Sequence, residues 1–156
     1  MDKAPEQTEF RVIKLESEIR LRAPRERVWD AMTIEQQKWY PYSYGQARLK
    51  AIVFEERVGG QCYEDWGDGN GTLYSTVTYF DKPKALCLRG SLKGAIHLEQ
   101  WAILTEDGEE TVLKHSTVAY GAISDDDAAG IRSHGELTQV ASQLRAWVED
   151  GVPVGT

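Results

Sequence analysis

The sequence predicts a single α+β domain, in which a curved, seven-stranded antiparallel sheet with two short helices closes over one long C-terminal helix. Three observations predict it. Segments that alternate apolar and polar residues recur over most of the chain, glycine-rich turn sequences separate them, and after residue 122 the apolar period lengthens to three or four residues. Because a sheet of this size must bury one face, we expect the last helix to cover it.

The first strand is expected at 10–21, where FRVIKLESEIRL is rich in β-branched residues and contains no breaker. Pro24 then opens a short helix, and a second short helix at 36–40 ends before Pro41. Strands joined by short loops pair as antiparallel neighbours. Six further strands are expected at 47–55, 61–66, 72–80, 85–90, 95–105 and 109–120.

The C-terminal helix begins after Ser124, a helix-capping residue that three aspartates follow at the positive end of the helix dipole. It is expected to end near Asp150, with Gly151 beyond it. Gly130 and Gly135 weaken its first half and allow a bend. The domain is thus expected to span residues 10–151, with a flexible N-terminus at 1–9 and a C-terminal tail at 152–156.

The composition is that of a globular protein, with 41% hydrophobic and 28% charged residues among 156. No apolar run reaches the roughly 20 residues of a membrane span, and the N-terminus has no apolar signal segment, so a cytoplasmic location and no membrane partner are expected. A net charge of −7 argues against nucleic acid as a partner. Cys62 and Cys87 lack metal-ligand spacing and are expected to be buried, reduced thiols. No cofactor or metal set is predicted.

A series of short motifs resembles the START/birch-pollen-allergen (SRPBCC) superfamily, in the bacterial branch similar to the C-terminal domain of the activator of heat-shock-protein ATPase. The motifs run in that family's order from about residue 13 to residue 150: APRERVWDA at 23–31, WY at 39–40, VGG at 58–60, YEDWGDG at 63–69, VTYFDKP at 77–83 and LKHS at 113–116. The resemblance implies a helix-grip fold around a ligand-sized cavity. The chain departs from the family pattern at Gln61, Cys62 and Gly90, where such proteins line the cavity, so an atypical pocket is expected.

His115 is the first candidate for chemistry. If Asp107-Gly108 is a two-residue turn, Gln100 faces His115 on the strand face that also carries Leu113, and the resemblance turns that face inward. His115 is then either a cavity histidine that exchanges protons near neutral pH or a core histidine hydrogen-bonded to Gln100 or to a backbone carbonyl.

Glu64 is the second candidate, because it shares the strand face of Trp66, which the family pattern turns inward. A carboxylate in an apolar cavity would have a raised pKa and could bind an amine or act as an acid. The alternatives are a solvent-facing side chain or one paired with Arg89. Ligand contacts are expected from both candidates, from Gln100 and from five aromatic residues that serve equally well as core, namely Trp39, Tyr40, Trp66, Tyr79 and Trp147.

These residues are compatible with three functions. The first is non-catalytic binding of an apolar or aromatic small molecule in the cavity. The alternatives, implied by the resemblance, are a polyketide cyclase or dehydratase that uses His115 and Glu64, and a chaperone-associated interaction module. The sequence leaves open whether the chain is an enzyme, and it leaves open a homodimer through a sheet edge or through the face that bears Trp101, Ile103 and Val112.

Overall fold

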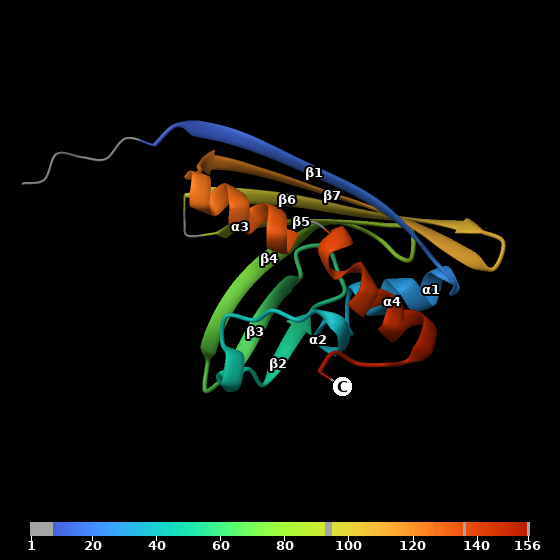
Figure 1. Cartoon of the computed structure of the whole chain (residues 1–156). Helices are drawn as coiled ribbons and strands as arrows, with labels where there is room; N and C mark the ends of the chain where they lie inside the picture. Colours follow the sequence, from blue (N-terminus) through green and yellow to red (C-terminus); the bar gives the residue numbers. More distant parts are fainter. Residues whose placement is uncertain (1–7, 93–94, 136, 156) are drawn as a thin grey trace, which may run out of the picture.

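The computed structural model describes residues 8–92, 95–135 and 137–155, and it confirms the α+β fold (Figure 1). One antiparallel sheet has the order β1-β7-β6-β5-β4-β3-β2. Its strands are β1 (Phe10–Leu21), β2 (Ala51–Phe54), β3 (Gln61–Gly67), β4 (Asn70–Asp81), β5 (Ala85–Leu92), β6 (Ile96–Asp107) and β7 (Glu110–Ala122). The helical segments are α1 (Arg25–Met32), α2 (Gln36–Trp39), η1 (Gln46–Arg48), α3 (Asp125–Gly135), η2 (Leu137–Val140) and α4 (Ala141–Asp150).

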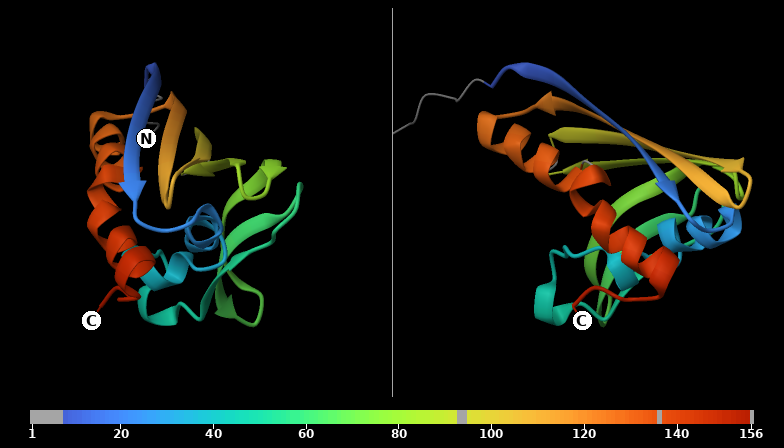
Figure 2. Two further views of the ribbon diagram at one scale, coloured as in Figure 1. Left: turned by 90° about the vertical axis from the view of Figure 1, so that its right-hand side faces the viewer. Right: turned by 45° about the vertical axis from the view of Figure 1, so that its right-hand side comes forward.

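The sheet is strongly curved, and β4, β3 and β2 turn away from the plane of the other four strands (Figures 1 and 2). Three irregularities in strand pairing lie among β3, β4 and β5. The register shifts between Cys62 and Tyr63 and between Asp65 and Gly67 on β3, and between Val77 and Tyr79 on β4. Because a bulge bends its strand and increases its twist, these shifts account for the change of direction.

The C-terminal segment differs from the single long helix that the sequence predicted. It is divided into α3, the 3₁₀ turn η2 and α4, and α3 ends at Gly135, one of the two glycines expected to permit a bend. The predicted start and end of this C-terminal helical segment are confirmed. The Asp127 amide donates to Ser124 Oγ at 3.1 Å, and Gly151 follows α4 with a φ of +67°.

Two apolar clusters hold these helices to the concave face of the sheet. The larger lies where α1, α2 and α4 meet the sheet, around Trp29, Leu113 and Leu144. The smaller lies beside α3, around Ala119 and Ile131. All three C-terminal helical segments contact β1, and Figure 2 shows them running beside that edge strand. In the part of the chain that is described, no helix is long and apolar enough to cross a membrane.

The β6–β7 hairpin turns one residue later than the sequence predicted. Asp107 pairs with Glu110 across Gly108-Glu109, with Gly108 at a φ of +62°, which an L side chain rarely adopts. The register is therefore shifted by two residues, and Ala102 rather than Gln100 lies opposite His115. Because side chains alternate with a period of two, an even shift leaves each side chain on its predicted face.

The predicted strand at 47–55 is also shorter in the structure. Only Ala51–Phe54 pairs with β3, and the preceding residues form η1. The tail after α4 does not project freely, since the Val154 amide donates to the Lys38 carbonyl of α2 at 2.7 Å.

Candidate functional site

The middle of the concave face is a neutral surface that mixes polar and apolar side chains. Cross-strand pairing aligns Ser17 on β1 with His115 on β7 and Ala102 on β6. The next row aligns Thr117 with Gln100. Directly opposite residues share a face, so all of these side chains point toward the helices.

This surface is incompletely covered. Strands β5 and β6 lie at the centre of the sheet, where inward side chains are normally buried, yet Leu88, Leu98 and Gln100 are only half-buried. The neighbouring inward residues Thr117 and Ala119 are buried. Because the C-terminal helices pack beside β1, they leave this strip of β5 and β6 accessible.

His115 lies on this inward face, as predicted. It is half-buried, and burial lowers the pKa of its imidazole to about 4, so the ring is neutral at neutral pH. The predicted hydrogen bond to Gln100 does not form, because the two-residue shift places Gln100 in the next row. Among the described residues, His115 has no hydrogen-bond partner.

Glu64 also points inward, but its surroundings are polar rather than apolar. Its buried carboxylate accepts hydrogen bonds from the Tyr44 and Gly45 amides at 2.8 Å each, from Trp66 Nε1 at 2.9 Å, and from the Tyr74 hydroxyl. Burial alone would raise the pKa of Glu64, but these donors stabilise the charged form and lower its pKa. The expectation of a raised pKa is therefore wrong, and Glu64 is an ionised anchor for the loop before η1.

The other predicted partner of Glu64 is engaged elsewhere, since Arg89 pairs with Glu99 at 3.0 Å on the convex face. The two candidate proton carriers are not brought together. Glu64 is on β3 and His115 is on β7, with β4, β5 and β6 between them in the sheet. Neither is poised to exchange protons at neutral pH, because one is held ionised and the other neutral.

The predicted aromatic residues lie in different environments. Trp39 is buried and donates to the Ala31 carbonyl at 2.7 Å, with Tyr40 at its edge. Trp147 is half-buried and donates to Glu35 at 3.0 Å. Trp66 is half-buried beside Glu64. These three tryptophans have structural partners. Tyr40 remains half-buried near the concave face, and burial raises the pKa of its hydroxyl to about 12.

Tyr79 is placed on the convex face, where it is 46% exposed and lies with its ring centroid 5.2 Å from that of Trp101. Ser17 and Tyr74 were not among the residues predicted for the site. The alternation along β1 could have found Ser17, because it shares the parity of Leu15. Tyr74 had no such signal, since the bulge in the β3–β4 pairing places it opposite no residue of β3.

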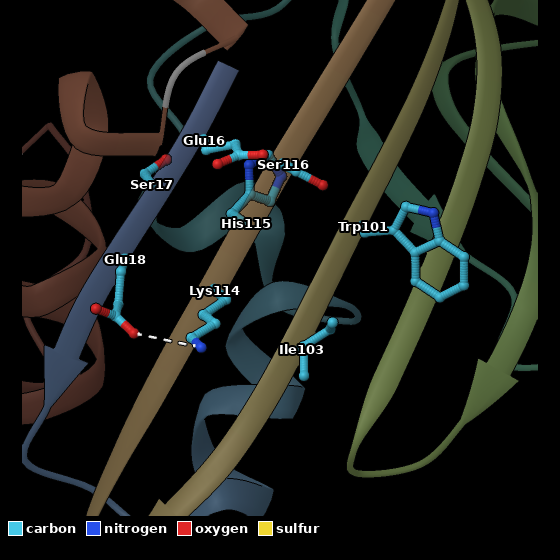
Figure 3. Close-up of a pocket in the computed structure, with 8 residues that line it drawn as sticks. All are labelled: Glu16, Ser17, Glu18, Trp101, Ile103, Lys114, His115 and Ser116. Atoms are coloured by element: carbon cyan, nitrogen blue, oxygen red, sulfur yellow. Dashed lines mark ion pairs between the residues drawn. The ribbon is translucent and has the colours of Figure 1, made fainter. Parts of the chain in front are cut away.

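The convex face carries a separate, shallow hollow of about 480 Å³ (Figure 3). Its lining residues are Glu16, Ser17, Glu18, Trp101, Ile103, Lys114, His115 and Ser116, although strand alternation turns the Ser17 and His115 side chains to the concave face. Lys114 pairs with Glu18 at 3.8 Å, and both side chains are more than half exposed. This hollow is an open, mixed-charge surface, and a homodimer through it stays a prediction.

Both thiols are buried, as predicted, but on opposite faces of the sheet. Cys62 points inward from β3, and burial raises the pKa of its thiol to about 12. Cys87 is on the convex side of β5, where the cross-strand neighbours Tyr79 and Trp101 flank it. Burial raises the pKa of Cys87 as well. Among the described residues, no three His, Cys, Asp or Glu side chains are placed to hold a metal ion.

We expect neither thiol of the native chain to react with Ellman's reagent at pH 8, because only an accessible thiolate attacks it. Trp101→Ala should make Cys87 reactive, giving about one thiol per chain, while Cys62 stays protected. The double variant Trp101→Ala/Cys87→Ser is the control and should give none. Rapid reaction of the unchanged protein would show that the two rings do not cover Cys87.

A curved antiparallel sheet that grips a C-terminal helix defines the helix-grip fold. No protein-family model matches the sequence, and no curated protein matches it. Solved structures do match. MLL2253 from Mesorhizobium loti is 18% identical over 88% of this chain and 97% of its own, with a TM-score of 0.63. CalU16 from Micromonospora echinospora is 18% identical over 89% of this chain and 87% of its own, with a TM-score of 0.55.

DynU16, described as a protein in the dynemicin biosynthetic locus, is 19% identical with a TM-score of 0.60; the match covers 90% of this chain and 48% of DynU16. The chain therefore spans about half the length of that protein. At these sequence identities the structural similarity establishes the fold alone, and function has to be inferred from the residues of this chain.

Proposed function

We propose that this protein binds an apolar small molecule on the concave face of its sheet, without catalysing a reaction on it. The observation that carries the proposal is the half-buried strip formed by Leu88, Leu98 and Gln100 at the centre of the sheet. Leaving apolar area of a central strand accessible to water costs about 25 cal/mol per Å². A ligand that covers the strip would recover that free energy.

The alternative of a cyclase or dehydratase has less support. General acid–base chemistry needs groups that exchange protons at the working pH and that reach the same substrate atoms. Glu64 is saturated by four donors and His115 is neutral, with three strands between them. The motif series also supports membership of the START/birch-pollen-allergen superfamily, in the branch similar to the heat-shock-protein ATPase activator. No feature of the described residues specifically supports the alternative of a chaperone-associated module.

N-phenyl-1-naphthylamine, a neutral fluorophore that brightens in apolar surroundings, tests the proposal. We expect saturable binding to the unchanged protein and a rise in its melting temperature. Leu98→Trp places an indole over the strip, in the space that the fluorophore would occupy, and should weaken binding at least about tenfold.

Ile103→Trp is the matched control, because it adds the same side chain to the convex face of the same strand, where Ile103 is 44% exposed. It should leave binding unchanged. The proposal fails if the fluorophore does not bind saturably. It also fails if Ile103→Trp weakens binding as much as Leu98→Trp does, because the fluorophore would then lie in the convex hollow.

A further inference from the structure

Three polar side chains on the concave face have no hydrogen-bond partner in the described part of the chain. They are the Ser17 hydroxyl on β1, the His115 imidazole on β7 and the Gln100 amide on β6. Ser17 and His115 are directly opposite one another, and Gln100 lies in the adjacent row. Polar groups that pack against a protein interior are nearly always hydrogen-bonded to protein or to water, so three groups without a protein partner are available to bond to water or to a ligand.

These polar atoms are not sealed inside the protein. Among the described residues, the one side-chain polar atom that is both inaccessible and unpartnered is Nε of Arg25, which lies on α1. The polar atoms of Ser17, Gln100 and His115 therefore keep access to solvent, and each residue is half-buried. They form an accessible polar band on the inward side of the sheet.

The band contains no charge. On β1, β5, β6 and β7 the charged residues of inward parity are Arg11 and Glu106, and both lie near strand ends. Each is already paired, Arg11 with Asp125 at 2.8 Å and Glu106 with Arg25 at 3.5 Å. A charged ligand group at the band would thus be desolvated without a counter-charge from the sheet, which is strongly unfavourable.

Apolar side chains lie on both sides of the band; Leu113, Leu104 and Ala119 are buried, and Leu98 is half-buried. On one side, the next inward residues along β7 and β6 are Leu113 and Leu104, which belong to the larger apolar cluster. On the other side they are Ala119 and Leu98, of the smaller cluster or packed against it. Along β6 and β7, the inward side chains are therefore apolar, then polar, then apolar.

We propose that the ligand is an uncharged molecule with a hydrogen-bonding oxygen or nitrogen near its middle and an apolar group on either side. The central atom bonds to Gln100, His115 or Ser17. One apolar group covers Leu98, the next inward residue along β6, and the other covers Leu88, which lies opposite Gln100 on β5. This inference rests on the proposed function and narrows it to a class of ligand. Fatty-acid anions and alkylamines, which carry a positive charge at neutral pH, are excluded from that class.

Three probes of one shape test the inference by competition with N-phenyl-1-naphthylamine on the full chain. Fluorene is apolar throughout, 9-fluorenone has a carbonyl between its two rings, and fluorene-9-carboxylate has an anion at that position. We expect fluorenone to compete at about five- to tenfold lower concentration than fluorene, the gain of a neutral hydrogen bond. The carboxylate should compete at least about tenfold less well than fluorene.

Two substitutions locate the polar group. Gln100→Leu and His115→Phe each remove a polar side chain from the band, and each should reduce the preference for fluorenone over fluorene. Fluorene needs no hydrogen bond, so its continued binding shows that either variant is folded. Glu99→Gln changes the convex face of the same strand and should leave the preference unchanged.

The outcomes are distinguishable. If fluorene and fluorenone compete equally well, the ligand needs no central polar group. If fluorene-9-carboxylate competes better than fluorene, the ligand need not be uncharged. A preference that survives in both Gln100→Leu and His115→Phe overturns its assignment to this band. In each of these cases binding of the fluorophore remains, whereas loss of saturable binding by the unchanged protein overturns the proposed function itself.

Discussion

Glu64→Gln is expected to lower the free energy of unfolding by about 3 kcal/mol. The carboxylate accepts four hydrogen bonds from the Tyr44 and Gly45 amides, the Trp66 indole and the Tyr74 hydroxyl. A glutamine of the same size offers one acceptor oxygen and turns an NH₂ group toward the remaining donors, so at least one buried donor loses its partner. Denaturant unfolding followed by tryptophan fluorescence measures the change.

Glu99→Gln is the matched control, because Glu99 is a carboxylate whose ion pair with Arg89 is largely exposed on the convex face. Exposed pairs of this kind contribute about 0–1 kcal/mol, so the control should unfold almost as the unchanged protein does. Equal destabilisation by the two substitutions would contradict an anchoring role for Glu64.

The loss in Glu64→Gln should be local as well as global. The Tyr44 and Gly45 amides are expected to exchange with deuterium much faster than in the unchanged protein, because they lose their carboxylate acceptor. The effect should also depend on pH. Because the folded state lowers the pKa of Glu64 below 4.5, its contribution is complete above that pH and is lost as the pH falls through the folded pKa.

The ionisation state of Glu64 could not be predicted from the sequence. Alternation along β3 placed Glu64 on the strand face of Trp66, and the family resemblance turned that face inward, where the structure has it. Its state of ionisation depended on donors that alternation does not reveal. Two come from the backbone of a loop some twenty residues earlier, and Tyr74 is brought in by a bulge that no residue pattern in β4 marked. An inward carboxylate was therefore expected to have a raised pKa and instead has a lowered one.

The fold was more accessible to prediction because period-two alternation and turn residues are local signals. They predicted antiparallel pairing of the strands that short loops join, and they grouped the side chains of β6 and β7 by face; the family resemblance indicated which of those faces is inward. They did not fix which pair of residues flanks the hairpin turn, since Asp107-Gly108 and Gly108-Glu109 both place a glycine in the turn. The two-residue error moved Gln100 away from His115 while leaving both on the concave face.

Acidification should destabilise the unchanged protein more than His115→Gln. The unfolded histidine has a pKa of about 6.5, and burial lowers the folded value to about 4. Above pH 6.5 the ring is neutral in both states and stability does not depend on its protonation. Between pH 6.5 and 4 the unfolded state takes up a proton that the folded state excludes. The free energy of unfolding therefore decreases as the pH is lowered through this range.

The full difference between these two pKa values corresponds to at most about 3 kcal/mol, and the partial exposure of His115 reduces it to about 1–2 kcal/mol. Unfolding of both proteins across pH 8 to 4 isolates this contribution, because the carboxyl groups that titrate in the same range are common to both. His97→Gln, which removes a histidine from the exposed face of β6, is the control.

A pH-independent difference between the unchanged protein and His115→Gln would mean that water reaches the imidazole freely. The same experiment with the fluorophore bound connects stability to the proposed site. A neutral ligand over the polar band removes water from His115 and disfavours its protonated form further, so bound ligand should steepen the acid destabilisation of the unchanged protein and leave that of His115→Gln unaltered. An identical response in both proteins would place the fluorophore away from the band.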